Sequence, residues 1–283
     1  MRIHSRAGAA LLALGLLAAV PAALAVKPAD SASLPAVEPG LQAAIDGNWR
    51  DPAFVSRDVY RHPGQTLAFF GLKPDQTVIE IIPGTGWYAE ILAPYLRDNG
   101  QYIAAVVDPE ALTGKARESQ QRGRARLQEK FVAQPTVYGK AGFVAYAPDK
   151  PVFGADESAD MVLTFRNVHN WRMAGQAQAM FEGFYKVLRK GGVLGVVEHR
   201  ADADVAEDDA TGYVGTDQVI ALATAAGFEL AGNSAVNANP RDSKDYPNGV
   251  WTLPPTNRHD AADDAKYQAI GESDRMTLKF VKP

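Results

Sequence analysis

Short apolar runs alternate with longer, partly polar stretches along most of this chain. The short runs predict buried strands and the longer stretches predict helices, because a strand needs only four to eight residues or so and a helix about ten or more. The predicted strands are 77–82, 101–107, 142–146, 161–165, 193–197 and 228–236, and the predicted helices are 87–97, 110–132, 173–188 and 216–226. This alternation is typical of an α/β protein with a parallel sheet covered on both faces.

The ends of the chain depart from this alternation. Residues 41–71 combine short helical patterns with prolines and predict a small helical cap. Residues 275–281 alternate apolar and polar side chains and predict a closing strand. Residues 237–274 form a long polar insertion that leaves the carboxyl end of a parallel strand, which is where ligands bind in such sheets. We therefore expect a lid over the ligand site, with a disordered connection as the alternative.

The first residues have the features of an export signal. Arg2 and Arg6 precede an apolar run over 7–20, and a small-x-small cleavage site ends at Ala25. This predicts a signal peptide over 1–25 and a flexible leader over 26–40. An uncleaved membrane anchor is the alternative, but the apolar run is shorter than the ~20 residues that span a bilayer. The expected location is the periplasm or the exterior, with no membrane contact after cleavage.

Composition excludes several classes of function. The chain of 283 residues has no cysteine and a formal net charge of −4. Disulfides, thiolate catalysis, cysteine-based zinc sites and a lipid anchor are therefore excluded. The acidic balance argues against a nucleic-acid partner, which requires clustered Lys and Arg. We expect a small-molecule substrate, and the sequence leaves the oligomeric state open.

The loop after the first predicted strand, Glu80 to Gly86, carries the clearest chemical signal. Its glycines let the backbone turn sharply and approach a ligand at the start of a helix. Gly84-x-Gly86-x-x-Ala89 also matches a dinucleotide fingerprint, with Asp108 at a suitable distance. An NAD-type oxidoreductase and a purely structural turn are therefore alternatives. Glu80 favours a ligand with ammonium and sulfonium groups, because its carboxylate would repel a pyrophosphate.

On these residues the chain resembles the class I S-adenosylmethionine-dependent methyltransferases. The matching segments are Val78–Gly86, Asp108, Asp160–Phe165, Val187–Leu194 and Ala225–Phe228. The resemblance covers about residues 64–236 and the last strand, and it is strongest to a group of signal-bearing bacterial proteins predicted to be methyltransferases. It implies a Rossmann-like doubly wound sheet, mostly parallel with an antiparallel last strand, and S-adenosylmethionine as the cofactor.

The resemblance also implies a cofactor site. The acid at Glu80 and the glycine loop would hold the methionine part, and Asp108 would accept hydrogen bonds from both ribose hydroxyls. The cofactor-site candidates are Glu80, Pro83, Gly84, Thr85, Gly86, Asp108, Phe165 and Asn167. Ile82 departs from the pattern, because the family usually has its first glycine there, and we expect a stiffer backbone at this position.

Two histidines after predicted strands are the candidate catalytic residues. His169 precedes Trp171, which we expect to stack on a ring, and a histidine is suited to remove a proton from a hydroxyl acceptor. His199 lies between Glu198 and Arg200, which offer a second base or an anion-binding pair. The alternatives are that His169 only satisfies loop backbone and that Glu198 and Arg200 form a surface ion pair.

The acidic run from Asp202 to Asp209 suggests a divalent cation, because hard cations prefer carboxylate oxygens. It lacks calcium-loop spacing, so a solvated loop is favoured and no metal site is predicted. The sequence therefore predicts S-adenosylmethionine-dependent methyl transfer to an unidentified small molecule in the periplasm. A non-catalytic nucleoside- or metabolite-binding protein of the same fold is the alternative, ahead of an NAD-type oxidoreductase.

Overall fold

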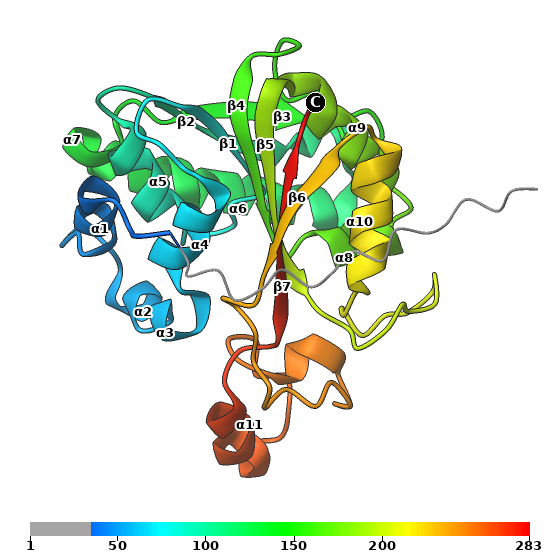
Figure 1. The fold of residues 1–283 in the computed structure, drawn as a ribbon. Helices are drawn as coiled ribbons and strands as arrows, with labels where there is room; N and C mark the ends of the chain where they lie inside the picture. The colour runs from blue at the N-terminus through cyan, green and yellow to red at the C-terminus, as the bar shows by residue number, and fades with distance from the viewer. Residues whose placement is uncertain (1–34) are drawn as a thin grey trace, which may run out of the picture.

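A computed structural model describes residues 35–283, in which seven strands form one sheet in the order β3-β2-β1-β4-β5-β7-β6 (Figure 1). Adjacent strands from β3 to β5 are parallel, and β7 is antiparallel to both β5 and β6. The strands are β1 (Thr77–Ile81), β2 (Gln101–Val107), β3 (Gly142–Tyr146), β4 (Ala159–Phe165), β5 (Leu188–His199), β6 (Glu229–Ser234) and β7 (Arg275–Val281). This confirms the expected Rossmann-like doubly wound sheet with an antiparallel last strand. The predicted signal peptide and most of the leader lie outside the described residues.

Helices cover both faces of this sheet and form two apolar cores. The α-helices are α1 (Pro39–Ile45), α2 (Pro52–Val55), α3 (Asp58–Arg61), α4 (Pro63–Phe70), α5 (Ala89–Leu96), α6 (Gly114–Ala133), α7 (Pro135–Tyr138), α8 (Val168–Met173), α9 (Ala177–Val187), α10 (Thr216–Ala225) and α11 (Asp264–Ile270), and the 3-10 turns are η1 (Pro109–Ala111), η2 (Gly249–Thr252) and η3 (Ala261–Asp263). Successive strand residues point to opposite faces, so Val78 packs with α1, α4, α5 and α6, whereas Ile79 packs with α8, α9 and α10. Helices α1 to α4 form the expected N-terminal cap. Over residues 35–283, no helix is both long and apolar enough to cross a membrane.

The segment after β4 differs from the prediction. In place of one helix over 173–188 there are two, α8 and α9, separated by Gly175 at φ 67°. The second helix ends at Val187, close to the predicted end, and Gly191 and Gly192 already belong to β5, which begins at Leu188. Strand pairing explains this boundary, since Leu188 lies opposite Ala159 of β4 and the Gly191 N–H donates to the Lys282 carbonyl.

The cap and the 237–274 insertion meet at the carboxyl ends of the central strands. Both β5 and β6 are antiparallel to β7, so they share one direction and the insertion leaves the sheet at that edge. There, Glu272 accepts hydrogen bonds from Arg57 at 2.7 Å and Arg61 at 3.1 Å. Arg57 and Glu272 are 215 residues apart in the sequence. Figure 1 shows α3 and α11 at this same end of the molecule.

The insertion buries several apolar side chains of its own. Leu253 is fully buried, and Val250 and Tyr267 are almost so. The Tyr267 ring contacts Tyr246 edge-on, with ring centroids 5.8 Å apart. Burial of these side chains gives the insertion a defined position above the strand ends.

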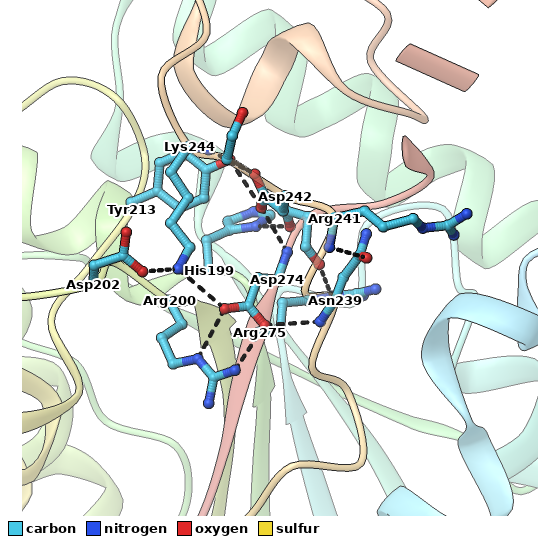
Figure 2. Close-up of polar contacts among 12 residues, drawn as sticks. His199, Arg200, Asp202, Tyr213, Asn239, Arg241, Asp242, Lys244, Asp274 and Arg275 are labelled. Carbon is cyan, nitrogen blue, oxygen red and sulfur yellow. Dashed lines mark hydrogen bonds and ion pairs between the residues drawn. The ribbon is translucent and has the colours of Figure 1, made fainter. Parts of the chain in front are cut away.

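A polar cluster around Asp274 fastens both ends of the insertion to the sheet (Figure 2). The Asp274 carboxylate accepts hydrogen bonds from Arg200 at 2.8 and 2.9 Å and from the Asn239 N–H at 2.9 Å, and it lies 3.3 Å from Lys244. The Asp274 N–H in turn donates to Asp242 at 2.7 Å. Because Asp274 is largely buried and Arg200 is partly so, this contact differs from an exposed ion pair, which contributes little.

Candidate functional site

The glycine loop presents an open backbone rim at the carboxyl edge of the sheet. Pro83 and Gly86 are buried, whereas Gly84 and Thr85 are exposed. A Cβ placed on Gly84 would have no atom within 4 Å, but one on Gly86 would meet Leu127 at 2.8 Å. Glycine is favoured at position 86 because its φ of 93° lies in the left-handed region and Leu127 of α6 packs close to it, and Gly84 leaves the rim open to a ligand.

Ile82 adopts a conformation that is normally left to glycine. Its φ is 50°, in the left-handed region, and its N–H still pairs with the Ala105 carbonyl at 2.8 Å. A β-branched residue in this region is unusual and carries strain on the order of 1–3 kcal/mol. The surrounding structure thus forces the glycine-like turn at the position where the sequence departs from the family pattern.

Glu80 lies in the core beneath the loop. It is 2% exposed and accepts a hydrogen bond from the Tyr102 hydroxyl at 2.7 Å. Burial raises the pKa of Glu80 to about 8 and outweighs the opposite effect of the Tyr102 hydrogen bond. Near neutral pH its side chain is therefore mostly an uncharged acid, and a cationic ligand beside it would favour the carboxylate form.

Asp108 is half-buried where β2 ends, and its Oδ1 accepts the Glu110 N–H at 3.0 Å. Glu80 pairs in register with Ala104, so Asp108 lies about 13 Å further along the strand direction. The structure places Asp108 on the same edge as the exposed loop rim and Glu80 below it. The two acids are therefore offset along the sheet, and the expectation that they hold two different parts of one cofactor stays a prediction.

Phe165 and Asn167 connect the end of β4 to the glycine loop. The Phe165 ring stacks on Tyr88, with centroids 3.6 Å apart and planes 13° apart. The Asn167 amide donates to the Ile81 carbonyl at 3.0 Å and to Thr164 Oγ1 at 3.1 Å. These contacts position the loop, and the Asn167 amide is already engaged by protein atoms.

His169 forms a buried dyad with Glu198. The ring nitrogen Nδ1 lies 2.9 Å from Glu198 Oε1, and this carboxylate also accepts the N–H groups of Val168 at 2.6 Å and His199 at 2.8 Å. Glu198 is fully buried and His169 is 5% exposed. An Nδ1–H that donates to the carboxylate leaves the Nε2 lone pair free to accept a proton. The interpretation of Glu198 and Arg200 as a surface ion pair was wrong, because Arg200 pairs with Asp274.

His199 lies beside this dyad, and both histidines line one cavity. Their ring centroids are 5.2 Å apart, and His199 Nδ1 contacts Ser273 Oγ at 2.5 Å. The cavity of about 190 Å³ lies between the strand ends and the insertion, which contributes Trp251. Burial lowers the pKa of His199 well below its usual value, and the nearby His169 and Arg166 lower it further. His199 is therefore a neutral imidazole near pH 7.

His169, Glu198 and His199 have donor atoms that all lie within 4.8 Å of one another, which makes them a group of potential metal ligands. However, the Glu198 oxygens already accept bonds from backbone N–H groups and from His169. The carboxylate thus orients an imidazole. In the acidic run, Asp202 pairs with Lys244 and Asp209 accepts the Thr211 hydroxyl.

Two residues that line the cavity were not predicted from the sequence, and the role expected for Trp171 was wrong. Arg166 and Glu272 line the cavity, but neither was a candidate, because nothing local in the sequence distinguishes them. Trp171, expected to stack on a ring, is instead 4% exposed and packs against Phe184 in the core. Trp251 of the insertion reaches His169, with ring centroids 5.9 Å apart.

Comparisons with known proteins show the fold. No protein-family model matches the chain. The arsenite methyltransferase of Halobacterium salinarum is 28% identical over 189 residues, which cover 63% of this chain and 42% of that relative. The chain therefore spans less than half of the length of this relative.

Among solved structures, a SAM-dependent methyltransferase from Aquifex aeolicus superposes with a TM-score of 0.54 at 15% identity, over 82% of this chain and 94% of the other. The cyclase SpnF superposes with a TM-score of 0.52 at 17% identity, over 84% of this chain and 86% of the other. The chain thus has the Rossmann-like fold of class I methyltransferases, and the fold by itself does not fix the reaction.

The raised pKa of Glu80 predicts a pH-dependent stability. The folded state keeps the proton up to about pH 8, whereas the unfolded chain releases it near 4.5, so the free energy of unfolding falls as pH rises between these values. Glutamine mimics the neutral acid, so E80Q should match the native protein at pH 5 and exceed it at pH 9 by on the order of 3–5 kcal/mol. Urea unfolding at both pH values measures the difference.

The matched control is E182Q, a change at an exposed glutamate of α9, which should leave the native pH dependence intact. If the free energy of unfolding changes with pH in the same way for E80Q and the native protein, Glu80 is ionised in the folded protein.

Proposed function

We propose that this protein transfers a methyl group from S-adenosylmethionine to a small molecule bound in the cavity beneath the insertion. The observation that carries the proposal is the buried His169–Glu198 dyad, which faces this cavity at the carboxyl edge of a methyltransferase-type fold. In open α/β sheets, this edge is where ligands bind.

Residues at the same edge fit the cofactor. The backbone around Gly84 is open, so an amino-acid group can approach it closely. Asp108 uses Oδ1 to accept the Glu110 N–H, which leaves Oδ2 for a pair of ribose hydroxyls. When bound, the cofactor supplies a methyl group attached to a sulfonium sulfur, which would leave readily as a neutral thioether. The role of Glu80 is limited by its burial, and we assign it to supporting the loop from below.

The protein's own contribution to the reaction is alignment and proton removal. Glu198 accepts the Nδ1–H of His169 and fixes the tautomer in which Nε2 is basic, so Nε2 can take the proton of an acceptor hydroxyl. The neutral His199 ring and Trp251 narrow the cavity around the acceptor. Enclosure by the insertion reduces water near the reacting groups.

Arsenite is not the acceptor that this chain favours, although a relative carries that activity in its name. Trivalent arsenic is a soft centre that prefers thiolate ligands, and the chain has no cysteine. The cavity instead offers imidazole, carboxylate, guanidinium and indole groups, which suit an organic molecule with oxygen or nitrogen functions.

We propose that the reaction takes place outside the cytoplasm. The basic start, the apolar run and the small-x-small site before Val26 support export. Fractionation of bacterial cells that express the full chain should recover it in the periplasm, with a mass that begins after Ala25. Recovery of the full-length chain from the cytoplasm would refute this part of the proposal.

Cofactor binding should depend on Asp108. D108N keeps an oxygen for the Glu110 N–H but removes the negative charge that favours two ribose hydroxyls, so it should weaken binding of S-adenosylmethionine about 10- to 100-fold. Calorimetric titration measures the affinity, and E110Q is the matched control because Glu110 is an exposed neighbour that pairs with Arg117. If the native protein does not bind S-adenosylmethionine, the cofactor assignment is refuted and only the fold assignment remains. Binding of a nicotinamide dinucleotide instead would favour the oxidoreductase.

Methyl transfer to a hydroxyl acceptor should depend on His169. H169Q should lower kcat about 10²- to 10⁴-fold without changing cofactor affinity, because a general base contributes this much. The assay follows labelled methyl groups from S-adenosylmethionine into a small-molecule extract by mass spectrometry. H259Q is the control, since His259 is not among the residues that line the cavity and its side chain contacts Asp260, Asp264 and Tyr267 of the insertion. Tight cofactor binding with no transfer by the native protein would instead identify a non-catalytic binding protein.

A further inference from the structure

The guanidinium of Arg166 lies in the cavity wall and has no hydrogen-bond or ion-pair partner among residues 35–283. The residue follows β4 and pairs its backbone N–H with the Val197 carbonyl at 2.7 Å. Its side chain is partly buried, and its φ of 62° lies in the left-handed region. A guanidinium that lines a cavity and has no partner in the described chain can donate hydrogen bonds to an anion bound there.

The charge around Arg166 is strongly unbalanced. Arg57, Arg61 and Arg275 all contact one carboxylate, Glu272, at 2.7 to 3.1 Å, and Arg166 lies within electrostatic reach of the same carboxylate. Even when the nearby Glu198 is counted, the positive charges exceed the negative by two.

Two further donors in this cluster lack partners. The Nη2 atoms of Arg57 and Arg61 are buried and have no hydrogen bond within residues 35–283. Arg61 is 3% exposed, with its guanidinium 4.7 Å from the centre of the Trp87 ring. Guanidinium groups match carboxylates in shape and can donate two parallel hydrogen bonds. A cluster with more donors than acceptors is therefore suited to an anion.

The size of the cavity restricts the anion to a small molecule. Val250, Trp251, Pro254 and Pro255 of the insertion line one side, although most of the cavity surface is polar. The volume of about 190 Å³ is smaller than the ~300–1,000 Å³ typical of sites for drug-sized ligands. His169 lines the same space, so a bound anion lies next to the proposed base.

We propose that the methyl acceptor is a small carboxylate-bearing molecule, whose carboxylate pairs with Arg166 while its hydroxyl faces His169. This inference rests on the proposed function. In the transfer, the acceptor oxygen bonds to the methyl carbon as the sulfur–carbon bond breaks, the electron pair of that bond stays on sulfur, and His169 Nε2 takes the hydroxyl proton. The Arg166 contact places the acceptor before the reaction and takes no part in proton transfer.

Thermal unfolding with benzoate as the probe tests the anion site without any cofactor. Benzoate should raise the Tm of the native protein in a concentration-dependent way, and benzamide, its neutral analogue, should not. R166Q should lose this shift. R166K keeps the positive charge but not the planar guanidinium that donates two parallel hydrogen bonds, so it should retain part of the shift. R172Q is the matched control, because Arg172 lies on α8 but lines a different cavity. Equal shifts with benzamide, equal shifts in R166Q, or no benzoate shift in the native protein would each overturn the proposal.

A second measurement identifies which carboxylate Arg166 binds. S-adenosylhomocysteine carries a carboxylate, whereas methylthioadenosine has the same nucleoside without the amino-acid group. R166Q should bind both as the native protein does, because the acceptor is the expected partner. A tenfold loss for S-adenosylhomocysteine alone would assign Arg166 to the cofactor and overturn the acceptor assignment. If the native protein binds benzoate but neither nucleoside, the anion site stands and the methyltransferase proposal fails.

Discussion

The buried carboxylate of Glu272 lies between two segments that are far apart in the sequence, and the site takes its shape from that contact. It accepts hydrogen bonds from Arg57 and Arg61 of the N-terminal cap and also contacts Arg275 at the start of β7. Burial alone would disfavour its charge, but the surrounding arginines prevail and lower the pKa of Glu272 to about 2. A buried carboxylate with several cationic partners is costly to separate from them, so cap and insertion are held over the strand ends together.

This contact also explains why the cavity is positively charged. One carboxylate cannot satisfy the donors of three arginines, and Arg166 is left to face the cavity. The same edge carries the His169–Glu198 dyad, in which a fully buried carboxylate orients a single imidazole. The imidazole that Glu198 orients and the guanidinium of Arg166 line the same small cavity, as the proposed binding of an acceptor next to the base requires.

The glycine-loop side and the insertion side of the edge are built differently. On the glycine-loop side, where we propose that the cofactor binds, the backbone of the loop and Asp108 offer groups at an open rim, and Glu80 lies in the core below as a mostly neutral acid. On the other side, where we propose that the acceptor binds, the insertion closes the cavity with Trp251 and its prolines. The fold is shared with a methyltransferase and with a cyclase. The fold by itself therefore does not fix the reaction, and our proposal rests on side chains at this edge.

The sequence by itself determined the sheet and its ligand edge. Strands such as 101–107 and 142–146 were predicted with their observed bounds, because apolar periodicity depends only on which side chains must be buried. His169 and His199 could be named because they follow buried strands. The sequence could not determine whether Glu80 is charged, because its pKa depends on burial beside Tyr102. Nor could it reveal Arg166 or Glu272 as cavity residues, since the other residues that line the cavity lie on distant segments. Charge balance and cavity shape come from contacts between distant parts of the chain, and only the tertiary structure decides them.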